Sequence, residues 1–345
     1  MMDMHSNIKD FQKLVSSIPN VGLDWHRKTI LDHARDTANF ITKNIKELKL
    51  PEGKDHSHAI VVSAGPGLHK NGSLKKIKEF NYKGVIIAVD GSLLHCLRTG
   101  VIPDFVLSLD PHPTRIVRWF GDPNFATHSK VDDYFTRQDL DIELRKKNIE
   151  GHLKDIDLVN QYAPKLKLLL STTTSQNVES RTREAKFDRY WWNPLMDNPK
   201  EEGLTRELYK INKAPCVNTG GNVGTAAWVF ATSIFKIPTI AMVGMDFGYQ
   251  KSTPYTLTQT YKELLDTTGM SAEDDLSFLF PEFKNPLTLE TCYTDPTYYW
   301  YRSNFFDLYK NSSSKTINCT ESGILHGEGL ECKYLDDFLS EVADG

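Results

Sequence analysis

The strongest constraint on the fold is a series of short, continuously apolar runs that alternate with helical segments. Strands that are apolar along their whole length are typical of a parallel sheet covered on both faces. We therefore predict an α/β fold with a mostly parallel sheet and helices on both of its faces. The runs are Ala59–Ser63, Val85–Asp90, Phe105–Asp110, Leu166–Thr172, Phe187–Pro194, Thr239–Asp246 and Thr316–Thr320.

A polar stretch, Pro51–His56, separates this pattern from the start of the chain. Residues 1–50 carry apolar side chains at helical spacing and are predicted to form an N-terminal helical cap. Residues 58–330 are predicted to form the sheet domain, within which the polar segment 249–290 is a lid or an insertion. Residues 331–345 are predicted to end the chain with a C-terminal helix.

Composition excludes several classes of protein. The chain has 345 residues, with 41 basic and 45 acidic side chains and a formal net charge of -4, so it lacks the positive excess of a nucleic-acid-binding protein. No run reaches the roughly 20 apolar residues of a membrane span, and Met1–Asp10 is not a secretory signal. The five cysteines form no C-x-x-C pair, which argues against a disulfide framework or a zinc site. We expect a cytoplasmic protein, and an oligomer remains open.

Three of the apolar runs end in an aspartate, namely Asp90, Asp110 and Asp246. In an open parallel sheet, ligands bind outside the carboxyl ends of the strands, where these side chains would emerge. Any one of them could instead be a turn residue or a helix cap, for which aspartate is also favoured. The occurrence of three favours a functional edge of the sheet.

Two turns of small residues follow the same logic. The first, after the first run, consists of Ser63, Ala64, Gly65, Pro66 and Gly67. Its amides could hold a phosphate, although the spacing fits neither G-x-G-x-x-G nor a P-loop, and a tight strand-to-helix turn is the alternative. The second, Thr219–Thr225, could bind a phosphate, ribose or base through Gly221, Asn222 and Thr225, or could simply cap a helix.

Other side chains are weaker candidates. His112 follows Asp110 and could act as an acid–base group, because the pKa of histidine lies near neutrality. The aromatic stretch Tyr293–Tyr301 could stack on a base or sugar, or could belong to the core. His326 is a further candidate of this kind, although it could be a histidine that is merely hydrogen-bonded.

The ordered set of these motifs resembles the 6-hydroxymethylpterin diphosphokinase MptE-like family, which includes the motility accessory factor (Maf) proteins. The resemblance covers roughly residues 58–330 and is weak over 112–215. The motifs that carry it are Ile60–Leu68, Ile87–Ser92, Gly100–Pro111, Asn222–Ala227, Ile240–Phe247 and Asn318–Gly327.

The resemblance implies a Rossmann-like, sialyltransferase-like nucleotide-binding fold. In the family, Maf proteins are implicated in transferring nonulosonic, sialic-acid-like sugars from CMP donors to flagellins, and archaeal enzymes transfer diphosphate from ATP to a pterin alcohol with Mg²⁺. By resemblance, Ser63–Leu68 would hold the donor phosphate or ribose, Asp90 and Asp110 would line the donor pocket, and Asn222 and Asp246 would complete it. We take Asp110, His112 and Asp246 as the candidate catalytic residues.

Three functions follow as hypotheses. The first is a transferase for a CMP-activated sugar, which requires no metal cofactor. The second is an ATP-dependent pterin diphosphokinase, in which Asp90, Asp110 and Asp246 would gather Mg²⁺. The third is a non-catalytic nucleotide-binding accessory protein of surface-glycan assembly, because Gly67 replaces the serine usual in the family and Tyr255–Tyr261 lacks its histidine. The expected partner is a nucleotide or nucleotide-sugar donor, with a protein, a glycan or a small alcohol as acceptor.

Overall fold

The computed structural model describes residues 4–131 and 142–343, and its core is a nine-stranded sheet. The strand order is β12-β11-β7-β1-β2-β3-β4-β5-β6, and all neighbouring strands pair in parallel, which confirms the predicted sheet. The strands are β1 (Asp55–Val62), β2 (Gly84–Val89), β3 (Phe105–Ser108), β4 (Lys167–Ser171), β5 (Asp188–Pro194), β6 (Cys216–Val217), β7 (Thr239–Val243), β11 (Lys315–Asn318) and β12 (Glu331–Cys332).

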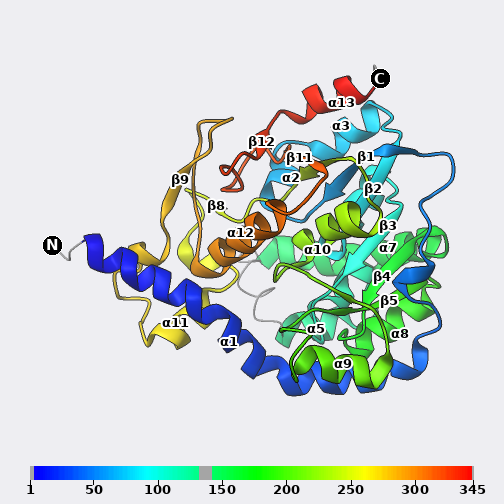
Figure 1. Cartoon of the computed structure of the whole chain (residues 1–345), viewed down its shortest axis with the longest axis horizontal. Coiled ribbons are helices and arrows are strands. Elements are labelled where there is room, and N and C mark those ends of the chain that lie inside the picture. The colour runs from blue at the N-terminus through cyan, green and yellow to red at the C-terminus, as the bar shows by residue number, and fades with distance from the viewer. Residues whose placement is uncertain (1–3, 132–141, 344–345) are drawn as a thin grey trace.

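Helices cover both faces of the sheet, as the apolar strands predicted (Figure 1). The main helices are α1 (Met4–Thr37), α2 (Pro66–Lys70), α3 (Ser73–Glu79), α4 (Asp90–Thr99), α5 (Phe125–Val131), α7 (Ile142–Tyr162), α8 (Gln176–Glu184), α9 (Leu204–Asn212), α10 (Val223–Val229), α11 (Tyr261–Thr268), α12 (Pro296–Tyr309) and α13 (Leu335–Ala343). None of the helices in the described part of the chain combines the length and the apolar character that crossing a bilayer requires.

The pleat of the central strand β1 shows why its whole sequence is apolar. Ala59 and Val61 pack in one core cluster with Trp228 of α10 and Phe305 of α12. Ile60 and Val62 pack in another cluster, on the opposite face, with residues of α3 and α13. Because successive side chains of a strand point to opposite faces, a strand buried on both sides must be apolar at every position.

The strand order places a topological switch at β1. From β1 the chain proceeds through β2, β3, β4, β5 and β6 toward one edge, and β7 then returns to the other side of β1. A crevice forms outside the carboxyl ends of the strands where the winding direction changes. This crevice lies between the turns that follow β1 and β7.

The N-terminal segment differs from the prediction of helix through residue 50. Helix α1 ends at Thr37, and a short 3₁₀ turn leads into extended backbone at Ile41. The chain then pairs with β5, where Trp191 N donates to Lys43 O. Tertiary pairing with the sheet edge therefore overrides the helical spacing of this segment.

The predicted lid or insertion has a small fold of its own. Strands β8 (Tyr249–Gln250), β10 (Thr291–Tyr293) and β9 (Glu282–Lys284) form a three-stranded sheet in that order. Together with α11 it encloses an aromatic cluster against which Leu14 of α1 packs. Figure 1 shows α1 running beside α11 and on to α9, so one helix spans from the insertion to the main domain.

Candidate functional site

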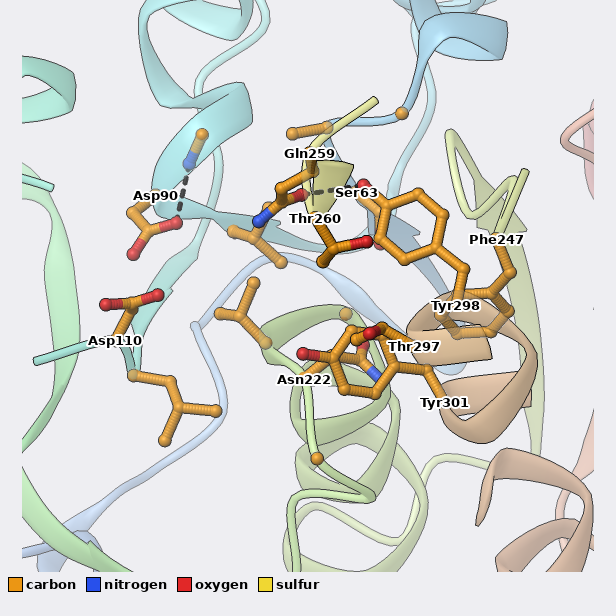
Figure 2. Close-up of a pocket in the computed structure, with 18 of the residues that line it drawn as sticks. Ser63, Asp90, Asp110, Asn222, Phe247, Gln259, Thr260, Thr297, Tyr298 and Tyr301 are labelled. Atoms are coloured by element: carbon orange, nitrogen blue, oxygen red, sulfur yellow. Dashed lines mark hydrogen bonds between the residues drawn. The ribbon is translucent and has the colours of Figure 1, made fainter. Parts of the chain in front are cut away.

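A large cavity, about 1820 Å³ in volume, lies at the carboxyl edge of the sheet. Its walls come from the turns after β1, β2, β3 and β7, from α1 and α12, and from the insertion (Figure 2). Sites for one small molecule typically measure about 300–1,000 Å³. The cavity is therefore large enough for two substrates.

Most of the predicted site residues meet at this cavity. Gly67 and Thr225 are the exceptions, because both are buried and absent from the cavity lining. The residues that line it are Ser63, Ala64, Gly65, Pro66, Asp90, Asp110, His112, Gly221, Asn222 and Asp246.

Asp90 is a buried carboxyl group at the first residue of α4. Its Oδ1 accepts a 2.7 Å hydrogen bond from Gly91 N, and its Oδ2 accepts one of 2.7 Å from Ser108 Oγ. Burial raises the pKa of Asp90 to about 7, and the nearby charge of Asp110 adds to this rise, while the two hydrogen bonds oppose it. A carboxyl group with a pKa near neutrality suits proton transfer.

Asp110 is exposed to the cavity beside Asp90, and Figure 2 shows both carboxylates on the same side of the pocket. Its Oδ1 accepts a 2.7 Å hydrogen bond from the amide of His112. His112 Nδ1 in turn accepts from the amides of Arg115, at 3.0 Å, and Thr114, at 3.3 Å. An imidazole whose Nδ1 accepts carries its proton on Nε2, so His112 is a donor at that atom.

Asp246 holds the first turn in place, which differs from the predicted catalytic role. Its carboxylate is 3% exposed and accepts from Gly67 N, at 3.1 Å, and from Ser322 Oγ. Burial raises its pKa to about 6, against the hydrogen bonds of Ser322 and Gly67. Both donors are protein groups, so the geometry favours structural support of the turn.

The amides of the first turn are also used within the protein. Gly65 N donates to Gly244 O at 2.8 Å, and Gly67 N donates to Asp246. Ser63 Oγ is buried against Gly224 and has no hydrogen-bond partner among the described residues. These two amides therefore already donate to acceptors within the protein, which a phosphate would have to replace.

The second turn caps α10. Asn222 Oδ1 accepts from Thr225 N at 2.8 Å, and Asn222 Nδ2 donates to Thr225 Oγ1 at 2.9 Å. Gly221 has a φ of 87° and lies against Trp300, which a Cβ at this position would approach to 2.5 Å. The cap interpretation therefore accounts for Thr225, whereas Gly221 and Asn222 present the turn to the cavity.

The cavity wall opposite Asp90 and Asp110 is built by residues that the sequence analysis did not single out one by one. Tyr298 Oη donates to Gln259 Oε1 at 2.7 Å, and Thr260 Oγ1 donates to Asp295 at 2.8 Å, so side chains of the insertion join α12 (Figure 2). Asp295 is fully buried and also caps α12 by accepting from Tyr298 N at 2.8 Å. Only the predicted lid and the aromatic stretch signalled this wall in the sequence.

The aromatic stretch divides between the cavity and the core. Tyr298, Trp300 and Tyr301 line the cavity, whereas Tyr293 is 2% exposed and belongs to the core of the insertion. His326 lies outside the cavity lining. The stretch therefore contributes three aromatic side chains to the cavity wall.

A three-aspartate metal site is not formed. No three His, Cys, Asp or Glu side chains of residues 4–131 and 142–343 lie together as a metal ligand set, and the Asp246 carboxylate accepts hydrogen bonds from Gly67 and Ser322 instead. Asp90 and Asp110 remain as two carboxylates. Mg²⁺ is commonly bound by one or two carboxylates plus substrate phosphates, so only that smaller set fits a metal–nucleotide complex.

Three comparisons relate the chain to known proteins. The family model "6-hydroxymethylpterin diphosphokinase MptE-like" matches residues 31–128. The 6-hydroxymethyl-7,8-dihydropterin pyrophosphokinase of Methanocaldococcus jannaschii is 24% identical over 232 residues, which are 65% of this chain and 71% of that protein. An uncharacterized protein of Treponema pallidum is 32% identical over 87 residues, 25% of this chain and 37% of that one.

Among solved structures, the Maf glycosyltransferase from Magnetospirillum magneticum AMB-1 matches with a TM-score of 0.52 and 13% sequence identity. The match covers 92% of this chain and 41% of that chain, so the chain spans less than half of the glycosyltransferase. At this identity the likeness concerns the fold. Residues 31–128 therefore match the 6-hydroxymethylpterin diphosphokinase MptE-like family model, and the α/β fold of the chain is that of a Maf glycosyltransferase.

Proposed function

We propose that the protein is a nucleotide-dependent transferase and that its donor is a CMP-activated nonulosonic sugar. The observation that carries the proposal is the pair formed by buried Asp90, with a pKa of about 7, and exposed Asp110 at one large cavity. Two neighbouring carboxyl groups in different environments can divide proton transfer and charge stabilisation between them. The cavity also has room for a donor and an acceptor.

The chemistry can be assigned to two residues. Asp110 takes the proton of the acceptor hydroxyl as its oxygen forms a bond to the anomeric carbon of the sugar. The bond from that carbon to the phosphate oxygen breaks, and CMP leaves with the electron pair. His112, with its proton on Nε2, donates a hydrogen bond to the leaving phosphate.

Direct assay of the donor tests this proposal. Release of CMP from a CMP-nonulosonate, measured by chromatography, should occur without added metal. Asp110→Asn and His112→Gln should each lower the rate about 10²-fold or more, in the range of general acid–base effects. Asp266→Asn is the matched control, because Asp266 is exposed on α11 and outside the cavity lining. Tight CMP binding without release from any donor would instead support the non-catalytic accessory function.

A pterin diphosphokinase is the second candidate, because the identity to the M. jannaschii enzyme extends over 65% of this chain. In that case Asp90 and Asp110 would hold Mg²⁺ on the triphosphate together with phosphate oxygens. Release of AMP from ATP in the presence of 6-hydroxymethyl-7,8-dihydropterin, dependent on Mg²⁺, would select this function over sugar transfer.

A further inference from the structure

A group of basic side chains lines the same cavity beyond Asp90. His69 lies on α2, and His95 and Arg98 lie on α4, with the two imidazole ring centroids 4.1 Å apart. Arg98 is eight residues from Asp90 on α4, which corresponds to about 12 Å along a helix. The region therefore lies apart from the proposed reacting groups.

The two histidines have no partners that would explain their pairing. Within the described parts of the chain, neither ring makes a hydrogen bond, and both rings line the cavity. Two imidazoles and a guanidinium placed together repel one another when protonated, so this arrangement disfavours the protonated form of both imidazoles. An anion with several oxygens would accept N–H groups from both rings and remove this repulsion.

Arg98 is held in position from the other side. Asp155 of α7 accepts from its Nε at 2.9 Å and from its Nη2 at 2.5 Å. Asp155 also lies 3.9 Å from His152 Nδ1, and His152 Nε2 contacts the carbonyl of Asp122 at 2.7 Å. A guanidinium has five N–H donors, and the bidentate pair uses one at each of two nitrogens.

We propose that His69, His95 and Arg98 form a second anion subsite of the cavity, which binds a phosphate or carboxylate group of a substrate. The subsite rests on the proposed function and extends it. In that function the donor phosphate lies beside His112, so the subsite binds a different anionic group. It recognises charge at the far end of one of the two substrates. The anionic oxygens bridge the two rings, and each ring takes up a proton as the anion binds.

The titration behaviour of the rings agrees with this geometry. Burial, together with Arg98, lowers the pKa of His69, and burial, His69 and Arg98 lower that of His95 to about 4. Both rings are thus neutral near pH 7 without a ligand. Anion binding should raise both pKa values, and by linkage the affinity should increase as the pH falls, by up to roughly tenfold per pH unit for each proton taken up.

Sulfate and N-acetylneuraminate are suitable probes, because neither changes its charge between pH 6 and 8. Calorimetric titration of the full chain should show tighter binding at pH 6 than at pH 8, and NMR should show the pKa of both histidines rising with the ligand, that of His95 from about 4 to above about 6. His69→Gln/His95→Gln should lose this pH dependence. His56→Gln is the control, because His56 is exposed and bonds only to the Pro51 carbonyl.

The two probes distinguish the sources of the anion. Binding of sulfate alone assigns the subsite to a phosphate, and binding of N-acetylneuraminate assigns it to a carboxylate. Equal binding by the wild type and the double variant, or no anion binding at either pH, would overturn the proposal. Asp110→Asn should keep the anion binding while losing transfer, so failure of the subsite is distinguishable from failure of the proposed function.

Discussion

Ser108 of β3 donates a 2.7 Å hydrogen bond to Asp90 at the end of the neighbouring strand β2. This contact joins two adjacent carboxyl ends of the sheet, and it stabilises the ionised form of a carboxyl group that burial would keep protonated. The pKa of Asp90, about 7, thus reflects burial and the charge of Asp110, which raise it, and the hydrogen bonds from Ser108 and Gly91, which lower it.

Replacing Ser108 should shift that balance in one direction. Ser108→Ala removes a hydrogen bond that lowers the pKa of Asp90, so the pKa should rise further, by about one unit for a loss of about 1.4 kcal/mol. If transfer requires ionised Asp90, the pH–rate profile should move to higher pH by that amount. An unchanged profile would show that the ionisation of Asp90 does not affect the proton transfer that Asp110 performs.

Asp90→Asn should change the pH dependence of stability. The pKa of Asp90 is raised in the folded state, so its contribution to stability is complete below its unfolded pKa near 4 and is lost as the pH rises through about 7. The wild type should therefore lose stability over this window, by at most roughly 4 kcal/mol at about 1.4 kcal/mol per pKa unit. The variant should lose less, which thermal unfolding at pH 4.5 and 7.5 would measure. Parallel losses in both proteins would contradict the buried placement.

Asp246→Ala tests whether this residue supports the turn or acts in catalysis. The variant leaves Gly67 N and Ser322 Oγ without an acceptor, at a cost of about 1–3 kcal/mol for each buried group. Denaturant unfolding should show this loss of stability. Full stability combined with complete loss of transfer would restore the catalytic role that the sequence predicted.

Gly65→Ala should destabilise the protein, because the turn has no room for a Cβ atom at this position. Gly65 has an ordinary φ of -70°, but a Cβ there would lie 2.6 Å from the carbonyl oxygen of Gly244 and against the Asp246 carboxylate. We expect a loss of about 1–3 kcal/mol, typical of overpacking, together with weaker CMP binding. Gly151→Ala is the matched control, since its Cβ would have no neighbour within 4 Å on helix α7. Equal behaviour of the two variants would show that the first turn tolerates displacement.

The gathering of Asp90 and Asp110 could be predicted from the sequence, because both follow apolar runs whose carboxyl ends must share one edge of a parallel sheet. The covered faces of the sheet followed from the same runs. Ser108 was also visible in principle, as the one hydroxyl within the apolar run Phe105–Leu109.

Other features depend on contacts between distant parts of the chain. Asp246 has the same local pattern as Asp110, and only its hydrogen bonds from Gly67 and Ser322 show that its carboxylate supports the first turn. The end of α1 at Thr37 is set by pairing of Lys43 with β5. The His69–His95 pair joins residues of two helices with no common motif.

The account depends on a nucleotide occupying the cavity at the carboxyl edge of the sheet. A crystal structure of the protein with CMP tests this most directly. The nucleotide is expected beside Asp90, with its phosphate within hydrogen-bond distance of His112 Nε2. The remaining side of the phosphate should face Asp110. CMP bound at the opposite edge of the sheet, or a cavity that stays empty at saturating CMP, would contradict the account.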